Sequence, residues 1–140
     1  MSLRITESEF FHMITLLRSM LVEAGLGAWE IEPWLTKTKL RMAQDHRDGT
    51  GAYFVEHVDG QPVGMASALL RDYHAFLSLK TGRYGCVTDS YVLPAYRGRG
   101  IDQRLHAEAH AWIRQNGAAI LDAIPPNIAR LAANSGGGKL

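Results

Sequence analysis

A helix with one buried face is predicted near the start of the chain. Hydrophobic residues recur at intervals of three and four over positions 10–21, which is the period of an amphipathic helix. Thr6 and Glu9 precede them with the spacing of a capping box, in which two side chains bond backbone groups at a helix start. Gly25 is expected to end this helix, because glycine accepts the left-handed conformation of a helix terminus.

A second helix and an antiparallel hairpin are predicted next. Pro33 suits the first position of a helix, so we expect the second helix to run from this residue to position 43 and to stop near 48–51. Two strands follow, over residues 52–57 and 62–70. An Asp-Gly pair at 59–60 separates them, and this dipeptide favours the tight turn of a hairpin.

The second half of the chain predicts an alternation of strands and helices. The expected elements cover residues 83–93 (strand), 101–115 (helix), 118–124 (strand) and 127–134 (helix). A strand, a helix and a second strand in this order form a parallel pair joined by a right-handed crossover. Together with the hairpin, they predict one α/β domain over residues 1–140, with a mixed, mostly antiparallel sheet flanked by helices.

Composition and charge exclude several function classes. Lys and Arg number 15 against 14 Asp and Glu, a net charge of +1, so nucleic acid is not expected as a partner. The lone cysteine, Cys86, excludes a disulfide framework. No apolar run approaches the roughly 20 residues of a membrane helix, and the start shows no secretion signal. We therefore expect a cytoplasmic protein without a membrane partner.

The candidate chemistry lies in the loop Arg97-Gly98-Arg99-Gly100-Ile101, between a predicted strand and a predicted helix. Such a junction presents free backbone N–H groups at the positive end of the helix dipole, and glycine lets the backbone approach a ligand closely. The pattern favours phosphate binding, whereas the alternative is a solvated turn with charged tips. A dinucleotide fingerprint and a P-loop are both excluded, because their further glycine and Gly-Lys-Ser/Thr are absent.

The longer string Val-Leu-Pro-Ala-Tyr-Arg-Gly-Arg-Gly-Ile at 92–101 resembles the acetyl-CoA site of the GNAT superfamily, whose fingerprint is Arg/Gln-x-x-Gly-x-Gly/Ala. The order of elements and Asn127 after the next strand agree, so the resemblance covers nearly the whole chain. It implies a GNAT-like acyl-CoA N-acyltransferase fold and an acetyl-CoA-dependent N-acetyltransferase. The acceptor would be the primary amine of a small molecule or peptide, attacking directly in a ternary complex. No metal is implied.

The resemblance also implies how the cofactor is held. Backbone amides of the loop would cradle the pyrophosphate, main-chain groups of the preceding strand would pair with the pantetheine arm, and Asn127 would bond the same arm. The implied cofactor-binding residues are Tyr91, Val92, Leu93, Arg97, Gly98, Arg99, Gly100, Ile101, Asp102 and Asn127.

Two departures from the family pattern carry expectations of their own. Asp102 stands where the fingerprint has Gly or Ala, so its carboxylate is expected to weaken cofactor binding or to turn outward. The family's strands after the last helix have no counterpart before Leu140, so we expect a C-terminally truncated fold. The strand over 118–124 would then be an open edge through which a homodimer forms. A second interpretation stays open, namely a non-catalytic coenzyme A-binding or protein-interaction module.

A general base is expected because an acceptor amine is protonated at neutral pH and must lose a proton before it can attack. Asp89 is the first candidate, since it lies on the strand expected to hold the cofactor; a turn-anchoring carboxylate is the alternative. Glu56 on the hairpin is the second, with a solvent-facing role as its alternative. Five aromatic residues could line the acceptor site or pack in the core: Trp29, Trp34, Tyr53, Tyr73 and Phe76.

Overall fold

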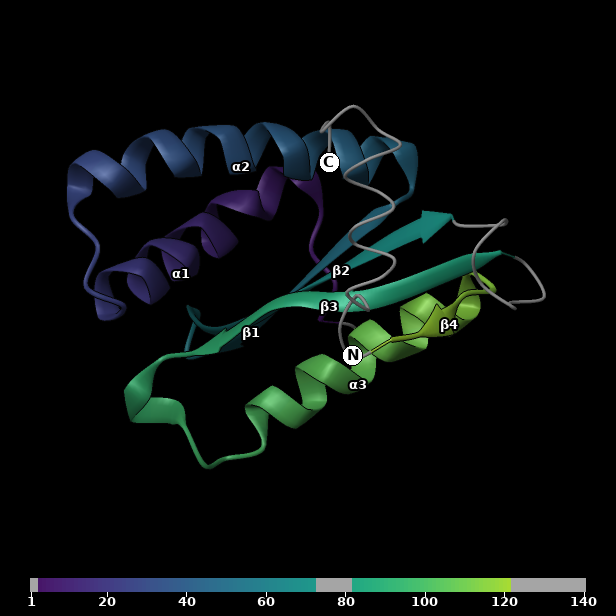
Figure 1. The fold of residues 1–140 in the computed structure, drawn as a ribbon. Coiled ribbons are helices and arrows are strands. Elements are labelled where there is room, and N and C mark those ends of the chain that lie inside the picture. Colours follow the sequence, from purple (N-terminus) through teal and green to yellow (C-terminus); the bar gives the residue numbers. More distant parts are fainter. Residues whose placement is uncertain (1–2, 73–81, 122–140) are drawn as a thin grey trace.

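A four-stranded sheet forms the middle layer of the protein (Figure 1). The computed structural model describes residues 3–72 and 82–121. Its elements are η1 (Glu7–Glu9), α1 (Phe10–Glu23), α2 (Ala28–Asp48), β1 (Gly51–Val58), β2 (Gln61–Asp72), β3 (Arg83–Val92), η2 (Pro94–Tyr96), α3 (Ile101–Gln115) and β4 (Ala119–Ile120). The strand order is β1-β2-β3-β4, with the first two pairs antiparallel and β3 parallel to β4. The predicted mixed, mostly antiparallel sheet is therefore confirmed.

Helices cover both faces of this sheet, with α1 and α2 on one side and α3 on the other (Figure 1). Side chains alternate between the two faces of a strand, and each face contributes to a separate hydrophobic core. On β2, Met65 packs with α1 and α2, whereas its neighbour Ala66 packs with α3. The side of the sheet to which a residue points can therefore be assigned from its register.

The first helix forms where the capping pattern predicted it. The backbone N–H of Thr6 donates to Glu9 Oε1 at 3.1 Å, and a single 3₁₀ turn leads into α1. Gly25 follows the helix with φ +92°, as its role at the terminus requires.

The predicted start of the second helix is wrong. The helix α2 begins at Ala28 rather than at Pro33, which lies inside its second turn. A proline there removes one backbone hydrogen bond. The buried side chains of Ile31 and Leu35 pack on either side of this position, and their burial holds the early turns in place. The end was predicted correctly, with Gly49 in the left-handed conformation.

The hairpin and the crossover agree with the sequence patterns. Asp59 and Gly60 both have positive φ, 51° and 78°, which is the conformation of the two-residue hairpin turn that Asp-Gly favours. The helix α3 has the predicted bounds. Of the strand expected over 118–124, the structure shows β4, at one end of the described sheet. The helix expected over 127–134 and Asn127 lie outside the described residues, and the homodimer stays a prediction.

Over residues 3–72 and 82–121, none of the helices combines the length and the apolar character needed to cross a lipid bilayer.

Candidate active site

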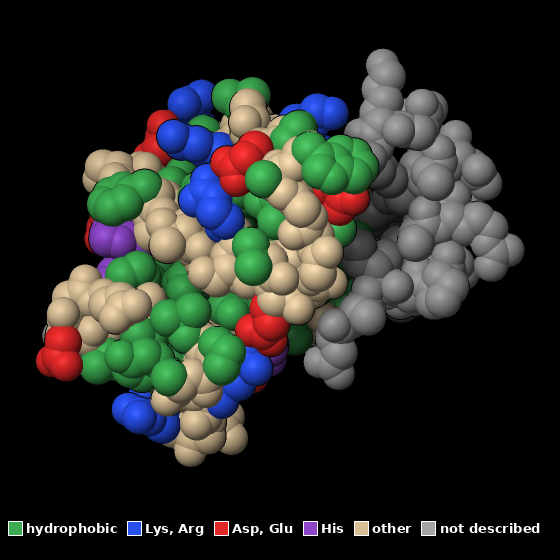
Figure 2. Space-filling model, turned by 90° about the vertical axis from the view of Figure 1, so that its left-hand side faces the viewer, with side chains coloured by type: hydrophobic (Ala, Val, Ile, Leu, Met, Phe, Trp, Pro, Cys, Tyr) green, Lys and Arg blue, Asp and Glu red, His purple; other side chains and the backbone are tan. Residues whose placement is uncertain are grey.

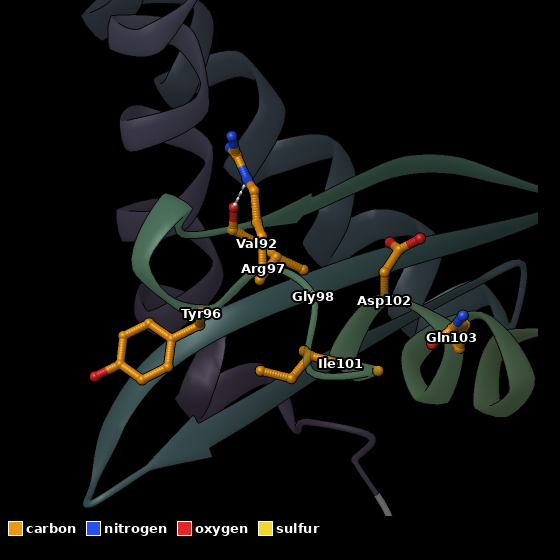
Figure 3. A pocket seen from close by; sticks show the side chains of 8 residues that line it. Val92, Tyr96, Arg97, Gly98, Ile101, Asp102 and Gln103 are labelled. Atoms are coloured by element: carbon orange, nitrogen blue, oxygen red, sulfur yellow. Dashed lines mark hydrogen bonds between the residues drawn. The ribbon is translucent and has the colours of Figure 1, made fainter.

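The loop between β3 and α3 forms a cavity of about 400 Å³ (Figure 3). Eight residues line it: Val92, Tyr96, Arg97, Gly98, Gly100, Ile101, Asp102 and Gln103. Gly98 and Gly100 have φ of +81° and +79°, a conformation that side chains disfavour. Gly100 is the N-cap of α3, so the glycines turn the chain sharply into the helix.

The loop amides are free to bind an anion. Within the described ranges, no hydrogen-bond acceptor meets the N–H groups of residues 98–103, whereas the N–H of Arg104 bonds the Gly100 carbonyl at 3.1 Å. These six amides surround the start of α3, where the helix dipole adds positive potential. The residues present therefore fit a phosphate group.

The Arg97 side chain is already engaged. Its Nε donates to the Val92 carbonyl at 2.9 Å, the dashed line in Figure 3. Its Nη2 donates to both carboxylate oxygens of Glu23, at the end of α1, at 2.9 Å each. The Tyr91 hydroxyl donates to Glu23 Oε1 at 2.8 Å, and the guanidinium lies 5.5 Å from the Tyr91 ring centroid. Arg97 thus anchors the loop to α1, a role that the sequence did not indicate.

Asp102 lines the loop cavity with an exposed side chain. Its side chain is 59 % exposed, and Oδ1 lies 3.5 Å from Nε2 of His106, one turn further along α3. The side chain also lines the loop cavity, so the expectation that it weakens cofactor binding or turns outward stays a prediction. A carboxylate in the first turn of a helix is favourable toward the dipole.

A β-bulge in β3 shapes the region around Asp89. Ser67 pairs with Asp89 and Ala68 with Val87, so Thr88 is an extra residue in the ladder. Neighbouring residues of a regular strand point to opposite faces, but a bulge re-aims its side chains. Thr88 and Asp89 therefore line one cavity of about 520 Å³, together with Leu69 of β2 and four residues of α2: Trp34, Lys37, Thr38 and Arg41.

Burial dominates the electrostatics of Asp89. Partial loss of hydration raises the pKa of its carboxyl above the ordinary range, and a hydrogen bond from the Ser67 hydroxyl opposes this shift. That bond is long, at 3.4 Å to Oδ2, whereas the Ser67 hydroxyl lies 2.8 Å from Thr88 Oγ1. A half-buried carboxyl with few partners binds a proton more readily than an exposed one, which suits a proton acceptor.

A family model described as "Acetyltransferase (GNAT) family" matches residues 15–133 of this sequence. The chain belongs to the GNAT family of acetyltransferases. The expected family is therefore confirmed, and with it the enzyme class. No curated protein matches the sequence.

Several solved structures share the fold of this GNAT chain. A predicted acetyltransferase from Clostridium acetobutylicum, crystallised with acetyl-CoA, is 16% identical with a TM-score of 0.72, over 95% of this chain and 86% of its own. A GCN5-related N-acetyltransferase from Ralstonia eutropha is 21% identical with a TM-score of 0.70, over 95% and 88%. The aminoglycoside N-acetyltransferase AAC(6′)-Iy, with a bound bisubstrate analogue, is 18% identical with a TM-score of 0.65, over 98% and 88%. The expected GNAT-like fold is confirmed.

The two candidate bases of this GNAT enzyme lie on opposite faces of the sheet. Glu56 pairs with Gly64, whose α-carbon faces Ile101 and Leu105 of α3. Its carboxylate accepts two hydrogen bonds from Arg104, at 3.0 and 2.6 Å, and its side chain is 13 % exposed. Asp89 lies instead on the α2 side. The structure therefore does not bring Asp89 and Glu56 together. Glu56 instead forms an ion pair with Arg104 of α3.

Among the described residues, no strand lies on the β4 side of the main chain that is expected to meet the pantetheine arm. Over the described residues, β4 pairs with β3 only at Tyr84 and Gly85, so the rest of that β3 edge has no strand beside it. Two groups near its end are engaged: the Leu93 N–H donates to the Val63 carbonyl at 2.8 Å, and the Val92 carbonyl accepts from Arg97. An extended ligand could pair along this edge as an added strand does.

Sequence reasoning missed several residues of the site. Of the five aromatic candidates, Trp34 lines the Asp89 cavity, Tyr53 is buried in the core and Trp29 is 80% exposed. Tyr73 and Phe76 lie outside the described residues. No sequence motif includes four further residues of the site: Glu23, Lys37, Arg41 and Thr88. The i, i+3, i+4, i+7 spacing of Trp34, Lys37, Thr38 and Arg41 is the signal that could have grouped them on one helix face.

Proposed function

We propose that this GNAT enzyme transfers the acetyl group of acetyl-CoA to the primary amine of a small acceptor, by direct attack in a ternary complex. One observation carries the proposal. The strand that carries half-buried Asp89 ends, three residues later, in a cavity ringed by unbonded amides. The candidate base therefore lies about 10 Å from the end of the strand, at 3.3 Å per residue, and the anion-binding loop follows that end.

The residues that would hold the cofactor follow from this arrangement. The amides of Gly98 to Asp102 would bind the pyrophosphate, with Arg97 holding the loop in shape and Arg99 adding positive charge. The main chain of Tyr91, Val92 and Leu93, at the end of β3, would receive the pantetheine arm through groups other than the engaged Val92 carbonyl and Leu93 N–H. Asn127 keeps its expected role as a further partner of that arm. The proposed reaction needs no metal.

Asp89 would accept the proton that the acceptor ammonium must lose. Bound acetyl-CoA supplies an activated thioester. The amine nitrogen then forms the new C–N bond while the C–S bond breaks, and the second amine proton passes to the departing sulfur. The raised pKa of Asp89 brings its proton affinity closer to that of the amine, which eases the transfer.

A covalent route through Cys86 is less well supported. Its side chain is 5 % exposed, and burial raises the pKa of the thiol, so little thiolate would form at neutral pH. Direct attack needs no such nucleophile. Glu56, held by Arg104 on the other face, is not part of the proposal.

Acetyl-CoA binding and thiol release test the proposal. A ligand that binds the folded state raises the melting temperature, so acetyl-CoA is expected to stabilise the protein and amines to trigger release of free thiol. If millimolar acetyl-CoA gives neither effect, the proposal is wrong. Stabilisation without thiol release across an amine panel would support the non-catalytic coenzyme A-binding module instead.

A pair of glycine variants locates the binding site. Gly98→Ala and Gly60→Ala both place a methyl group at positive φ, +81° and +78°, with no atom within 4 Å of it. Both should therefore lose similar stability, about 1–2 kcal/mol. Only Gly98→Ala changes the amide-lined cavity, so it alone should weaken acetyl-CoA binding, measured by calorimetry. Equal affinities for the two variants would place the cofactor elsewhere.

A further inference from the structure

The cavity beside Asp89 is built from two elements of different character. Trp34, Lys37, Thr38 and Arg41 recur at helical spacing and present one side of α2 to the sheet. Leu69, Thr88 and Asp89 form the strand side. A molecule in this cavity would thus lie between a cationic helix face and a strand with one carboxylate.

The two cations of this cavity are without ion-pair partners in the described ranges. Five other arginines of the described ranges form ion pairs: Arg18 with Glu32, Arg47 with Glu7, Arg83 with Asp72, Arg97 with Glu23, and Arg104 with Glu56. Lys37 and Arg41 lie one helical turn apart, and the nearest carboxylate on the cavity wall, Asp89, belongs to the opposite side. This site therefore has excess positive charge on one wall.

We propose that the acceptor is an amine that also carries a carboxylate, which Lys37 and Arg41 bind while the amine faces Asp89. This inference rests on the proposed acetyl transfer. The Arg41 guanidinium offers the planar pair of donors that matches a carboxylate, and Lys37 adds a second charge. Asp89 attracts the ammonium end and repels the anionic end, so the three side chains orient a zwitterion in one direction.

The same charges disfavour acceptors that are cationic throughout. A polyamine would place a second ammonium against Lys37 and Arg41, where like charges repel. Trp34, 40% exposed, adds a flat apolar wall beside the cations. The cavity therefore suits an amino acid or a short peptide with a free carboxylate better than it suits a polyamine such as spermidine.

Matched acceptors test the role of the carboxylate. A series of amino acids of increasing chain length is compared with the corresponding carboxamides, at equal concentrations of unprotonated amine, by thiol release from acetyl-CoA. At the best length, kcat/KM should be at least about tenfold higher for the acid, mainly through KM. Spermidine should be the poorest acceptor. Equal values for acid and carboxamide at every length would overturn the inference and leave acetyl transfer standing.

Variants of α2 link the preference to the two cations. Lys37→Ala and Arg41→Ala should each raise KM for the acid about tenfold and leave the carboxamide unchanged. Lys39→Ala removes an exposed charge from the same helix that does not line the cavity, so it should change neither. Lys37→Arg should restore most of the preference. A loss with Lys39→Ala equal to that with Lys37→Ala would contradict the inference.

A binding measurement separates this inference from the proposed function. If no amine releases thiol, the proposed acetyl transfer has failed, but ligand binding at α2 can still be measured. In the ¹⁵N-labelled protein, the acid should shift the amide resonances of residues 34–41 at concentrations about tenfold lower than the carboxamide does. Equal or absent shifts would overturn the carboxylate site independently of turnover.

Discussion

Asp89 shows how neighbouring residues make a single carboxyl suited to accept a proton. The extra residue at Thr88 turns the carboxyl toward α2, and partial burial raises its pKa. The groups around it are Lys37 and Arg41 across the cavity, Ser67 on β2 and the hydroxyl of Tyr53, whose own pKa is raised by burial and by Asp45. A charged carboxylate here is less stable than one in water, which is what a proton acceptor requires.

Asp89→Asn should lower kcat by about 10²- to 10⁴-fold, because the amine loses its proton acceptor. In the wild type, kcat/KM should fall on acidification through a pKa above that of an ordinary carboxyl, and the variant should lack this step. The substitution is expected to lower activity but not the stability of the folded state. A raised pKa means that the folded state favours the protonated carboxyl, so stability is lost as pH rises through that pKa. Asp89→Asn should therefore be at least as stable as the wild type at pH 7.

Glu56→Gln is the control for this experiment. It removes a carboxylate of the other face and weakens the pair with Arg104, so it should retain the acidic step in the pH profile. If the step disappears in Glu56→Gln and persists in Asp89→Asn, the assignment of the base is wrong.

At the scale of elements, two glycines determine how closely α3 approaches the sheet. A β-carbon at Gly64 would lie 2.8 Å from Cγ2 of Ile101 and 3.1 Å from Cδ1 of Leu105. A β-carbon at Gly85 would lie 2.7 Å from Cγ2 of Ile113, near the other end of the helix. The distances of 2.8 and 2.7 Å are too short for a real β-carbon. Because glycine has none, α3 can pack directly on the strands. The position of the amide-lined loop depends on the first contact.

Gly64→Ala should therefore cost about 1–3 kcal/mol of stability, because the start of α3 must move away from the sheet. The same displacement should raise the dissociation constant of acetyl-CoA, since Ile101 lines the loop cavity. Gly85→Ala should cost a similar amount of stability but should leave acetyl-CoA binding unchanged. Chemical denaturation and calorimetry measure the two effects, and equal loss of binding in both variants would contradict this coupling.

The elements that the sequence predicted well are those whose signals are local. The capping residues at Thr6, the turn at Asp59 and the helical repeat after Gly100 each act within a few positions of the chain. The start of α2 depends instead on burial of Ile31 and Leu35 against distant residues, which outweighs the local preference of Pro33.

The candidate site was predictable only in part, for the same reason. The glycine loop could be found because its backbone geometry demands particular residues. The bulge at Thr88 comes from the pairing of β3 with β2, and the partners of Arg97 and Glu56 lie 74 and 48 positions away in sequence. Nothing in the spacing of the chain could have placed Asp89 and Glu56 on different faces, because that assignment requires the register of the strands.

At the scale of the whole molecule, Glu23 and Arg97 connect the helix layer to the cofactor loop. The carboxylate accepts from both Arg97 and Tyr91, and these bonds hold the pKa of Glu23 below its ordinary value. A lowered pKa stabilises the folded state above the ordinary value of the carboxyl, and this contribution disappears as pH falls through the lowered one. The connection should therefore weaken in acid.

Glu23→Gln should lower the melting temperature at pH 7, with a smaller difference from wild type near pH 3. It should also raise the dissociation constant of acetyl-CoA about fivefold, because Arg97 no longer fixes the loop. Glu32→Gln is a matched control, since Glu32 also binds an arginine, Arg18, with two bonds of 3.0 Å and has a lowered pKa. Glu32→Gln should lower the melting temperature and leave the dissociation constant of acetyl-CoA unchanged. Equal acetyl-CoA affinity in the two variants would show that the connection does not position the loop.

The pairing of the arginines has a consequence for how a ligand finds this protein. Arg97 and Arg104 are paired with carboxylates and the net charge is +1, so apart from Arg99 the anion site consists of backbone dipoles, which act only at short range. Figure 2 shows charges of both signs interspersed over one face, without a large patch of one sign. Encounter would thus be unsteered, at an ordinary association rate of about 10⁵–10⁷ M⁻¹s⁻¹. In exchange, nucleic acids and other polyanions would not be drawn to compete for the loop.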